Sequence, residues 1–155
     1  MTMLEPGAKA PVFTLSDQNG DPVKSSSFKG APYVVYFYPR ANTPGCTTQS
    51  CEVRDAAPAL KKLGAKVVGV SPDKPSAQKK FDEKYSLGFP LLADEDHALA
   101  EAYGVWGEKK NYGKTYMGIV RSAFVVDAKG KIAAVFYKVS PKDTVPKVTE
   151  ALRAL

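Results

Sequence analysis

Two short apolar segments with a helix-forming segment between them constrain the fold of this chain most strongly. The first, Tyr33–Tyr38, is rich in β-branched and aromatic residues, as expected of a central strand buried on both faces. The second, Lys66–Ser71, has the same character. Between them, Pro44–Leu63 predicts a helix that is stopped by Gly64. A strand, a crossover helix and a second strand predict two parallel strands joined by a right-handed connection.

The remaining segments extend this unit into a larger sheet covered by helices. Asn19-Gly20 and Asp127–Gly130 are turn signals, each between two segments expected to pair antiparallel. We expect further strands over Pro11–Leu15, Pro22–Lys24, Leu91–Ala93, Ala123–Val126 and Ile132–Tyr137, and helices over Ser76–Tyr85, Asp96–Tyr103 and Thr144–Leu155. This order predicts an α/β fold, a thioredoxin-like three-layer sandwich with a mixed central β-sheet flanked by helices. Residues 1–155 show no repeat or linker, which predicts a single domain.

Composition excludes several classes of function. With 44% hydrophobic and 25% charged residues, the chain has the composition of a globular protein, and its longest apolar run is too short to cross a membrane. The net charge of +6 is spread over short pairs of basic residues, so we expect no nucleic-acid partner. The segment Met1–Gly7 lacks the features of a secretory signal, from which a cytoplasmic location is expected.

The two cysteines of the chain lie near the start of the predicted helix. Thr43 suits the N-cap, Pro44 suits the first helical position, and Gly45 has no side chain to obstruct approach. Cys46 then falls in the first turn, where free backbone N–H groups and the helix dipole favour a nucleophilic thiolate. The alternative is a buried and inert cysteine, because free thiols pack as small apolar groups.

Cys51 follows Cys46 by five residues. In an intact helix this spacing puts the two Cα atoms about 8–9 Å apart, whereas a disulfide requires about 7 Å or less. A bond between them would therefore require the first turn to unwind, and it would belong to a reaction cycle. Pro58 lies in the same predicted helix and is expected to kink or break it.

Metal binding is the other common use of cysteine thiols. A closed zinc site has four nitrogen or sulfur ligands, with cysteines usually two to four residues apart within a pair. Cys46, Cys51 and the single His97 supply three candidates at unsuitable spacing, so we expect no metal ion, and His97 is interpreted as a surface histidine. The spacing also excludes a Cys-x-x-Cys oxidoreductase.

Several motifs occur together along nearly the whole chain. The most specific is Pro-x-x-x-Thr-x-x-Cys, from Pro39 to Cys46, with Arg121-Ser122 downstream. Other motifs are Ala10–Leu15, Arg54-Asp55, Gly69–Asp73, Phe89–Asp94, Tyr103–Lys109 and Tyr112–Lys114. In these motifs the chain resembles peroxiredoxins of the bacterioferritin comigratory protein (Q-type) subfamily. It departs at Val120 and Ala123, where the family often has Glu and Thr; these positions bear on tuning of the site.

The resemblance implies a thiol-dependent peroxidase that reduces hydrogen peroxide and organic hydroperoxides. It makes Cys46 the peroxidatic cysteine and Cys51 the resolving cysteine, with the catalytic site completed by Pro39, Thr43 and Arg121. A reacting peroxide gains negative charge on both oxygens, which the Thr43 hydroxyl and the N–H groups of Gly45 and Cys46 could stabilise. Gln49, one turn after Cys46, is expected to orient Thr43 or Arg121.

The implied cycle needs no cofactor, because the oxidised sulfur itself stores the electrons. Cys46 becomes a sulfenic acid and then forms a disulfide with Cys51, which a thioredoxin or a similar dithiol protein reduces. One chain holds both thiols, and the subfamily is commonly monomeric. Two alternatives remain open: a thiol–disulfide redox sensor or carrier with little turnover, and a basic protein with incidental cysteines. Trp106 and Tyr112 are expected to pack rather than to take part in the chemistry.

Overall fold

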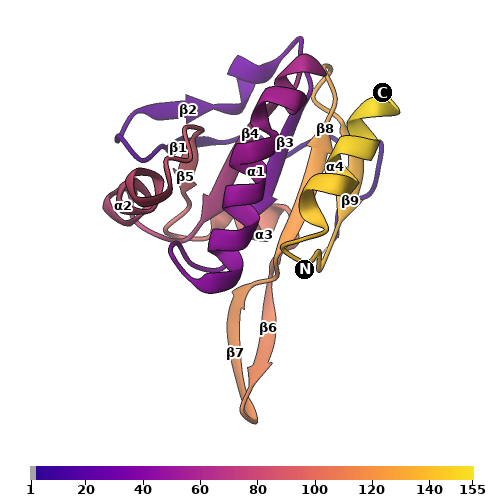
Figure 1. Ribbon diagram of the computed structural model, residues 1–155. Coiled ribbons are helices and arrows are strands. Elements are labelled where there is room, and N and C mark those ends of the chain that lie inside the picture. Colours follow the sequence, from indigo (N-terminus) through magenta and orange to yellow (C-terminus); the bar gives the residue numbers. More distant parts are fainter. Residues whose placement is uncertain (1–2) are drawn as a thin grey trace.

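A five-stranded mixed sheet forms the centre of the protein (Figure 1). The computed structural model describes residues 3–155. Its sheet contains β3 (Tyr33–Phe37), β4 (Lys66–Ser71), β5 (Leu91–Ala93), β8 (Ser122–Val126) and β9 (Ile132–Phe136). The strand order is β5-β4-β3-β8-β9. β5, β4 and β3 are parallel to one another, β8 pairs antiparallel with β3, and β9 pairs antiparallel with β8. The predicted crossover unit and the predicted mixed sheet are both confirmed.

The central strand β3 is buried along its whole length. It pairs with β4 on one side and β8 on the other, so that Val35 lies between Val68 and Phe124. Its side chains alternate between two apolar clusters, with Val34 and Tyr36 in one and Val35 and Phe37 in the other. Burial on both faces explains why the strand sequence shows no polar alternation.

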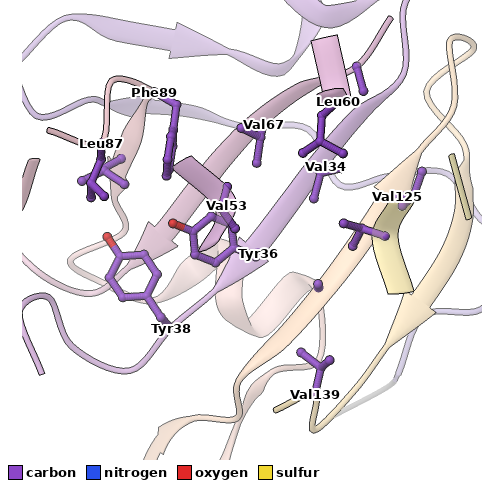
Figure 2. Packing of buried hydrophobic residues seen from close by; sticks show 14 of the residues in the cluster. Val34, Tyr36, Tyr38, Val53, Leu60, Val67, Leu87, Phe89, Val125 and Val139 are labelled. Atoms are coloured by element: carbon purple, nitrogen blue, oxygen red, sulfur yellow. The ribbon is translucent and has the colours of Figure 1, made fainter. Parts of the chain in front are cut away.

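Helices cover both faces of the sheet. α1 (Pro44–Lys62), α2 (Pro75–Tyr85) and α4 (Thr144–Arg153) contribute to the cluster around Tyr36. Figure 2 shows part of this cluster, in which the rings of Tyr36 and Tyr38 lie side by side, 5.6 Å apart. On the opposite face, α3 (Ala98–Ala102) packs into the second cluster. α3 is shorter than predicted, because His97 has a left-handed backbone with φ of 50° and precedes the first helical residue.

α1 continues through Pro58 without a break, so of the two expected alternatives, a kink or a break, the break is wrong. The ring of Pro58 lies on the exposed side of the helix. Water can replace the lost backbone hydrogen bond there, which makes an interior proline tolerable. The start of α1 agrees with the prediction: Thr43 occupies the N-cap position and Pro44 is the first helical residue.

Two small hairpins accompany the central sheet. The predicted pairing of β1 (Thr14–Ser16) with β2 (Pro22–Lys24) is confirmed, although β1 begins later than expected, and a 3-10 turn over Ser25–Phe28 follows. The second hairpin, β6 (Trp106–Asn111) with β7 (Lys114–Ile119), was not predicted. It extends away from the body of the protein at the end where α1 begins (Figure 1). None of the helices in the described part of the chain has the length and apolarity to cross a bilayer.

Candidate active site

The first turn of α1 holds Cys46 in the interior, with 1% of its surface exposed. The helix begins where Thr47 N–H donates to the Thr43 carbonyl over 2.8 Å. The N–H groups of Gly45 and Cys46 precede that bond, and no protein acceptor within residues 3–155 takes either of them. Such N–H groups point out of the helix N-terminus. Two free donors and the positive end of the helix dipole therefore lie beside the sulfur.

Arg121 places a permanent positive charge against this sulfur. It lies between β7 and β8, and its Nη2 donates to Cys46 Sγ over 3.3 Å. Its Nη1 donates to Gln49 Oε1 over 2.7 Å. A guanidinium in contact with a thiol favours the charged, nucleophilic form of the sulfur. The sequence placed Arg121 at the start of a buried strand, and the structure brings it to Cys46.

Gln49 links Arg121 to the start of α4. The Gln49 side chain is completely buried, and its Nε2 donates to Thr144 Oγ1 over 3.0 Å. The Thr144 hydroxyl in turn donates to the Ser140 carbonyl over 2.9 Å. Gln49 thus hydrogen-bonds to Arg121, one of the two expected partners, and forms no hydrogen bond with Thr43. Thr144 was not expected at the site, because no local pattern connects it with a residue 95 positions away.

Thr43 occupies the N-cap position, but its side chain does not cap the helix. Its hydroxyl donates instead to the Arg40 carbonyl over 2.8 Å. A hydroxyl has one proton to donate, so the remaining lone pairs of Thr43 Oγ1 are available to accept a hydrogen bond. The expectation that Thr43 donates to a substrate therefore does not fit this arrangement, in which Thr43 can act as an acceptor.

Gly45 leaves open the space in front of Arg121. A Cβ atom at this position would lie 3.1 Å from Arg121 Nη2 and 3.7 Å from Pro141 Cγ. A hollow of about 330 Å³ lies on this side of the first turn, and it is lined by Pro44, Gly45, Thr48, Ser140, Pro141 and Lys142. The expected role of this glycine, to leave access to the helix start, agrees with this geometry.

The segment that leads into α1 is fixed by a buried end of β4. Ala41 N–H donates to Asp73 Oδ2 over 2.7 Å, and the Ser71 hydroxyl donates to the same oxygen over 2.6 Å. This anchor lies between Pro39, which is half-buried, and Thr43. Asp73 therefore positions the segment that carries both predicted site residues. Its motif was noticed in the sequence, but nothing there indicated this contact.

Cys51 lies farther along α1 and is half-buried, and both cysteines are free thiols. Its neighbour Ser50 is anchored to the sheet by a hydrogen bond of 2.8 Å between Ser50 Oγ and the Tyr36 hydroxyl. Burial strongly raises the pKa of Tyr36, so the phenol stays protonated. Gly69 leaves room for this ring, because a Cβ atom there would lie 2.9 Å from the Tyr36 hydroxyl oxygen. The helix is therefore held in place between the two cysteines.

Lys109 brings a second cation near the site. Its Nζ donates to the Ile119 carbonyl over 2.9 Å at the base of the β6–β7 hairpin. Its pKa is lowered, chiefly by burial and further by the Arg121 guanidinium, whereas the Cys46 sulfur raises it. Nothing in the sequence singled out this lysine beyond its place at the end of the Tyr103–Lys109 motif.

The two aromatic residues expected to pack behave differently. Trp106 is half-buried and stacks on the ring of His97 with a centroid distance of 3.8 Å, so its packing role is confirmed. Tyr112 is 97% exposed, so the expectation that it packs is wrong. It lies in the tight turn of the hairpin with φ of 52°, where its side chain has no core to enter. Across residues 3–155, no three His, Cys, Asp or Glu side chains are grouped as metal ligands.

Comparison with known proteins agrees with this geometry. Residues 6–135 match the AhpC/TSA family. Peroxiredoxin Bcp of Escherichia coli K12 is 52% identical over 136 residues, which cover 88% of this chain and 87% of that protein. Peroxiredoxin Bcp of Bacillus subtilis is 46% identical over 150 residues, with coverage of 97% and 96%.

Solved structures of similar proteins have the same fold. Peroxiredoxin Q of Xanthomonas campestris has a TM-score of 0.88 at 35% identity, covering 99% of this chain and 96% of that chain. A cysteine-to-serine variant of PrxQ from Xylella fastidiosa has a TM-score of 0.93 at 28% identity, with coverage of 99% and 98%.

Proposed function

Because this chain belongs to the AhpC/TSA family and is a peroxiredoxin similar to the Bcp and PrxQ proteins, we propose that Cys46 is its peroxidatic and Cys51 its resolving cysteine. A peroxiredoxin reduces peroxides with a cysteine thiol and needs a thiol reductant to restore it. The observation that carries the assignment is the contact of 3.3 Å between Arg121 Nη2 and Cys46 Sγ at the start of α1. Cys51 is the other thiol of the chain, on the same helix.

In the first step, the Cys46 thiolate attacks the hydroxyl-bearing oxygen of the peroxide. A sulfur–oxygen bond forms while the oxygen–oxygen bond breaks, so the sulfur gives up two electrons and becomes a sulfenic acid. The other oxygen leaves with the bonding pair and takes a proton from solvent, as water or an alcohol. Free N–H groups of Gly45 and Cys46, together with Arg121, are placed to stabilise the charge on the oxygens.

Thr43 and Pro39 complete the proposed site. Thr43 Oγ1 donates to the Arg40 carbonyl, so it would accept a hydrogen bond from the peroxide O–H and orient that oxygen toward the sulfur. Pro39 follows the buried end of β3 and limits the access of water to the thiolate. Gln49 is a positioning residue, because it reaches the reacting atoms only through Arg121.

In the second step, the start of α1 unwinds and the Cys51 thiol attacks the sulfenic sulfur. A disulfide forms, the sulfur–oxygen bond breaks, and water leaves with the hydroxyl and one proton. Unwinding is required because the intact helix holds the two Cα atoms about 8–9 Å apart. A dithiol protein of the thioredoxin type then reduces the disulfide and returns both thiols.

Organic hydroperoxides are proposed as substrates beside hydrogen peroxide. The hollow of about 330 Å³ beside Gly45 contains the rings of Pro44 and Pro141 and is open enough to hold an alkyl group. A solved structure of the similar Xanthomonas campestris protein was described in connection with its alkyl peroxide reduction activity. We further propose that a monomer of one domain completes the cycle, because α1 carries both thiols.

Stopped-flow measurement of peroxide consumption tests the assignment. With thioredoxin, its reductase and NADPH, Cys46→Ser should lose all turnover. Cys51→Ser should keep one round of sulfenic acid formation and lose recycling through the internal disulfide. Full turnover by Cys46→Ser would refute the assignment. A wild-type protein that forms the disulfide but consumes peroxide only slowly would instead indicate a redox sensor or carrier.

A further inference from the structure

The β6–β7 hairpin, residues 106–119, is a projecting arm on which Glu108, Lys110 and residues 112–117 are exposed. Its six paired positions per strand give it a length of about 20 Å, and it extends beyond the end of the sheet at which α1 begins (Figure 1). At its base, Trp106 stacks on His97 and Ile119 is buried. Because a two-stranded hairpin is only marginally stable alone, this base must hold it in place.

Large apolar side chains gather on the exposed part of the hairpin. Tyr112 is 97% exposed, Met117 49% and Tyr116 46%. The other exposed large apolar side chains of the described residues are scattered over the N-terminal segment, the end of α1 and the C-terminus: Met3, Val12, Leu63 and Leu155. Tyrosine and methionine are enriched in protein interfaces. Three such residues on one projecting element indicate a contact surface for another protein.

The hairpin is also positively charged. Lys110 and Lys114 are exposed, Lys109 in the middle of β6 is half-buried, and Glu108 is the one acidic residue in the hairpin sequence. Lys138 and Lys142, both exposed, follow β9 on the way to α4. A second copy of this chain would bring the same positive charge, so like charges disfavour self-association here. An acidic surface is the complementary one.

A shallow hollow connects the hairpin with the active site. It has a volume of about 380 Å³, and its lining includes Lys109 and Lys110 of the hairpin, Arg121 of the active site, and Val139. Arg121 also follows the last residue of β7 by only two positions. A protein seated on the hairpin is thus beside the helix start that must unwind to expose the disulfide.

We propose that the β6–β7 hairpin is the docking surface for the reductant of this enzyme, a dithiol protein with an acidic face. Lys110 and Lys114 attract that face, and Tyr112 and Met117 supply apolar contact. The inference rests on the proposed function, because it requires the Cys46–Cys51 disulfide as the group to be reduced.

The docked partner reduces the disulfide in two thiol–disulfide exchange reactions. One partner thiolate attacks a sulfur of the Cys46–Cys51 disulfide, which forms a mixed disulfide and releases the other cysteine as a thiolate. The second partner thiol then attacks the mixed disulfide. The partner leaves as a disulfide, having given two electrons and two protons, and Cys46 and Cys51 are both thiols again.

A pair of charge reversals on the hairpin tests the proposal. The double variant Lys110→Glu, Lys114→Glu is compared with the wild type, using a thioredoxin of negative net charge, its reductase and NADPH. We expect kcat/KM for thioredoxin to fall about tenfold, because charges at an interface rim govern association. Tyr112→Ser, without a charge change, should lower it about threefold through lost contact area. The rate of Cys46 oxidation by peroxide and turnover with dithiothreitol should stay unchanged.

The matched control is Lys79→Glu, Lys80→Glu, which changes the net charge equally on two exposed positions of α2. We expect this control to change kcat/KM for thioredoxin less than twofold. Raising the salt from about 0.01 M to about 0.15 M shortens the Debye length from about 30 Å to about 8 Å, and should narrow the difference between wild type and hairpin variant.

Several outcomes would overturn the docking surface. An unchanged kcat/KM in both hairpin variants, or an equal fall in the α2 control, would show that the hairpin does not receive the reductant. A wild-type dimer in sedimentation velocity that the hairpin variants dissociate would assign the surface to a second copy. Failure of the proposed function looks different: the wild type would then consume no peroxide with dithiothreitol either.

Discussion

The central strand β3 and the start of α1 are adjacent in the chain and both buried, but they are held in different ways. β3 exchanges backbone hydrogen bonds with β4 on one side and β8 on the other. Besides the helix's own backbone hydrogen bonds, the first two turns of α1 are held to the rest of the protein by side chains: Arg121 on Cys46 and Gln49, Thr144 on Gln49, and Tyr36 on Ser50. Backbone pairing in a sheet cannot be released locally, whereas single side-chain contacts can.

This difference separates β3, which must stay folded during the proposed cycle, from the start of α1, which must unwind. A Cys46–Cys51 disulfide requires α1 to unwind at its start, and the strand beneath has to remain folded while it does so. A few side-chain hydrogen bonds, each worth about 1 kcal/mol, give a helix start that is ordered and yet can open. Four variants test this difference between the strand and the helix start.

The largest effect is expected in β3. Phe37→Ala removes a completely buried ring that packs against Tyr103 and Phe124, and should lower the free energy of unfolding by about 3–5 kcal/mol. Urea denaturation measures it, with Val12→Ala at an exposed position as the control, expected to change stability by less than about 0.5 kcal/mol. A loss below about 1 kcal/mol in Phe37→Ala would show that β3 is not the rigid region.

Arg121→Met should slow the reaction of Cys46 with peroxide and have little effect on the stability of the fold. Removing the donor at Cys46 Sγ should lower the second-order rate of Cys46 oxidation by about 10²- to 10³-fold. The free energy of unfolding should change by only about 1 kcal/mol, since Gln49 loses one hydrogen bond. Stopped-flow oxidation and urea denaturation give the two values. Arg153→Met, exposed at the end of α4, is the control, and equal rates in both variants would contradict the assigned contact.

Tyr36→Phe should loosen the hold on α1 between the two cysteines. Loss of the hydroxyl contact to Ser50 removes about 1 kcal/mol from the folded helix start. The disulfide should then form up to about fivefold faster after oxidation. Quenched-flow trapping of free thiols with mass spectrometry follows this step. Tyr116→Phe, with an exposed ring, should leave the rate unchanged; a slower disulfide in Tyr36→Phe would mean that the contact assists unwinding.

The smallest effect is expected in how the free energy of unfolding depends on pH, through a carboxyl group beside the central sheet. Asp94 follows β5, and burial raises its pKa although Leu99 and Ala100 N–H groups donate to it. Between the unfolded pKa of about 3.9 and this raised value, the native state binds more protons than the unfolded state. The free energy of unfolding should therefore fall as the pH rises through that window. Urea titrations should show a flatter profile in Asp94→Asn, and an identical profile would remove Asp94 as the cause.

The sequence was most informative where structure depends on local pattern. Tyr33–Phe37, Lys66–Ser71 and the start of α1 were predicted almost to the residue, because apolar runs, a proline at the first helical position and a terminating glycine act locally. The position of Cys46 in the first turn followed from the same signals. Arg121 was placed by a resemblance of motifs, and its distance to the sulfur came only with the fold.

Two features could not be predicted for physical reasons. Four of the six residues of β7 in the β6–β7 hairpin are exposed, so burial imposes no apolar alternation on its sequence. The hydrogen bond between Gln49 and Thr144 joins segments 95 residues apart, and no local pattern records such a meeting. Both features depend on which distant segments the folded sheet brings together, and this is decided only by the complete fold.

The narrow space above Gly69 has a consequence for how such sequences can vary. In a saturation library at this position, alanine would push a methyl group against the phenol of Tyr36 and the Leu91 side chain. Either β4 would shift and the Tyr36 ring would keep its place, or the ring would move and lose its hydrogen bond to Ser50. Screening such a library for premature disulfide formation would therefore recover substitutions in β4, although Gly69 carries neither thiol. The substitutions tolerated at Gly69 would report how firmly Tyr36 holds α1 through Ser50.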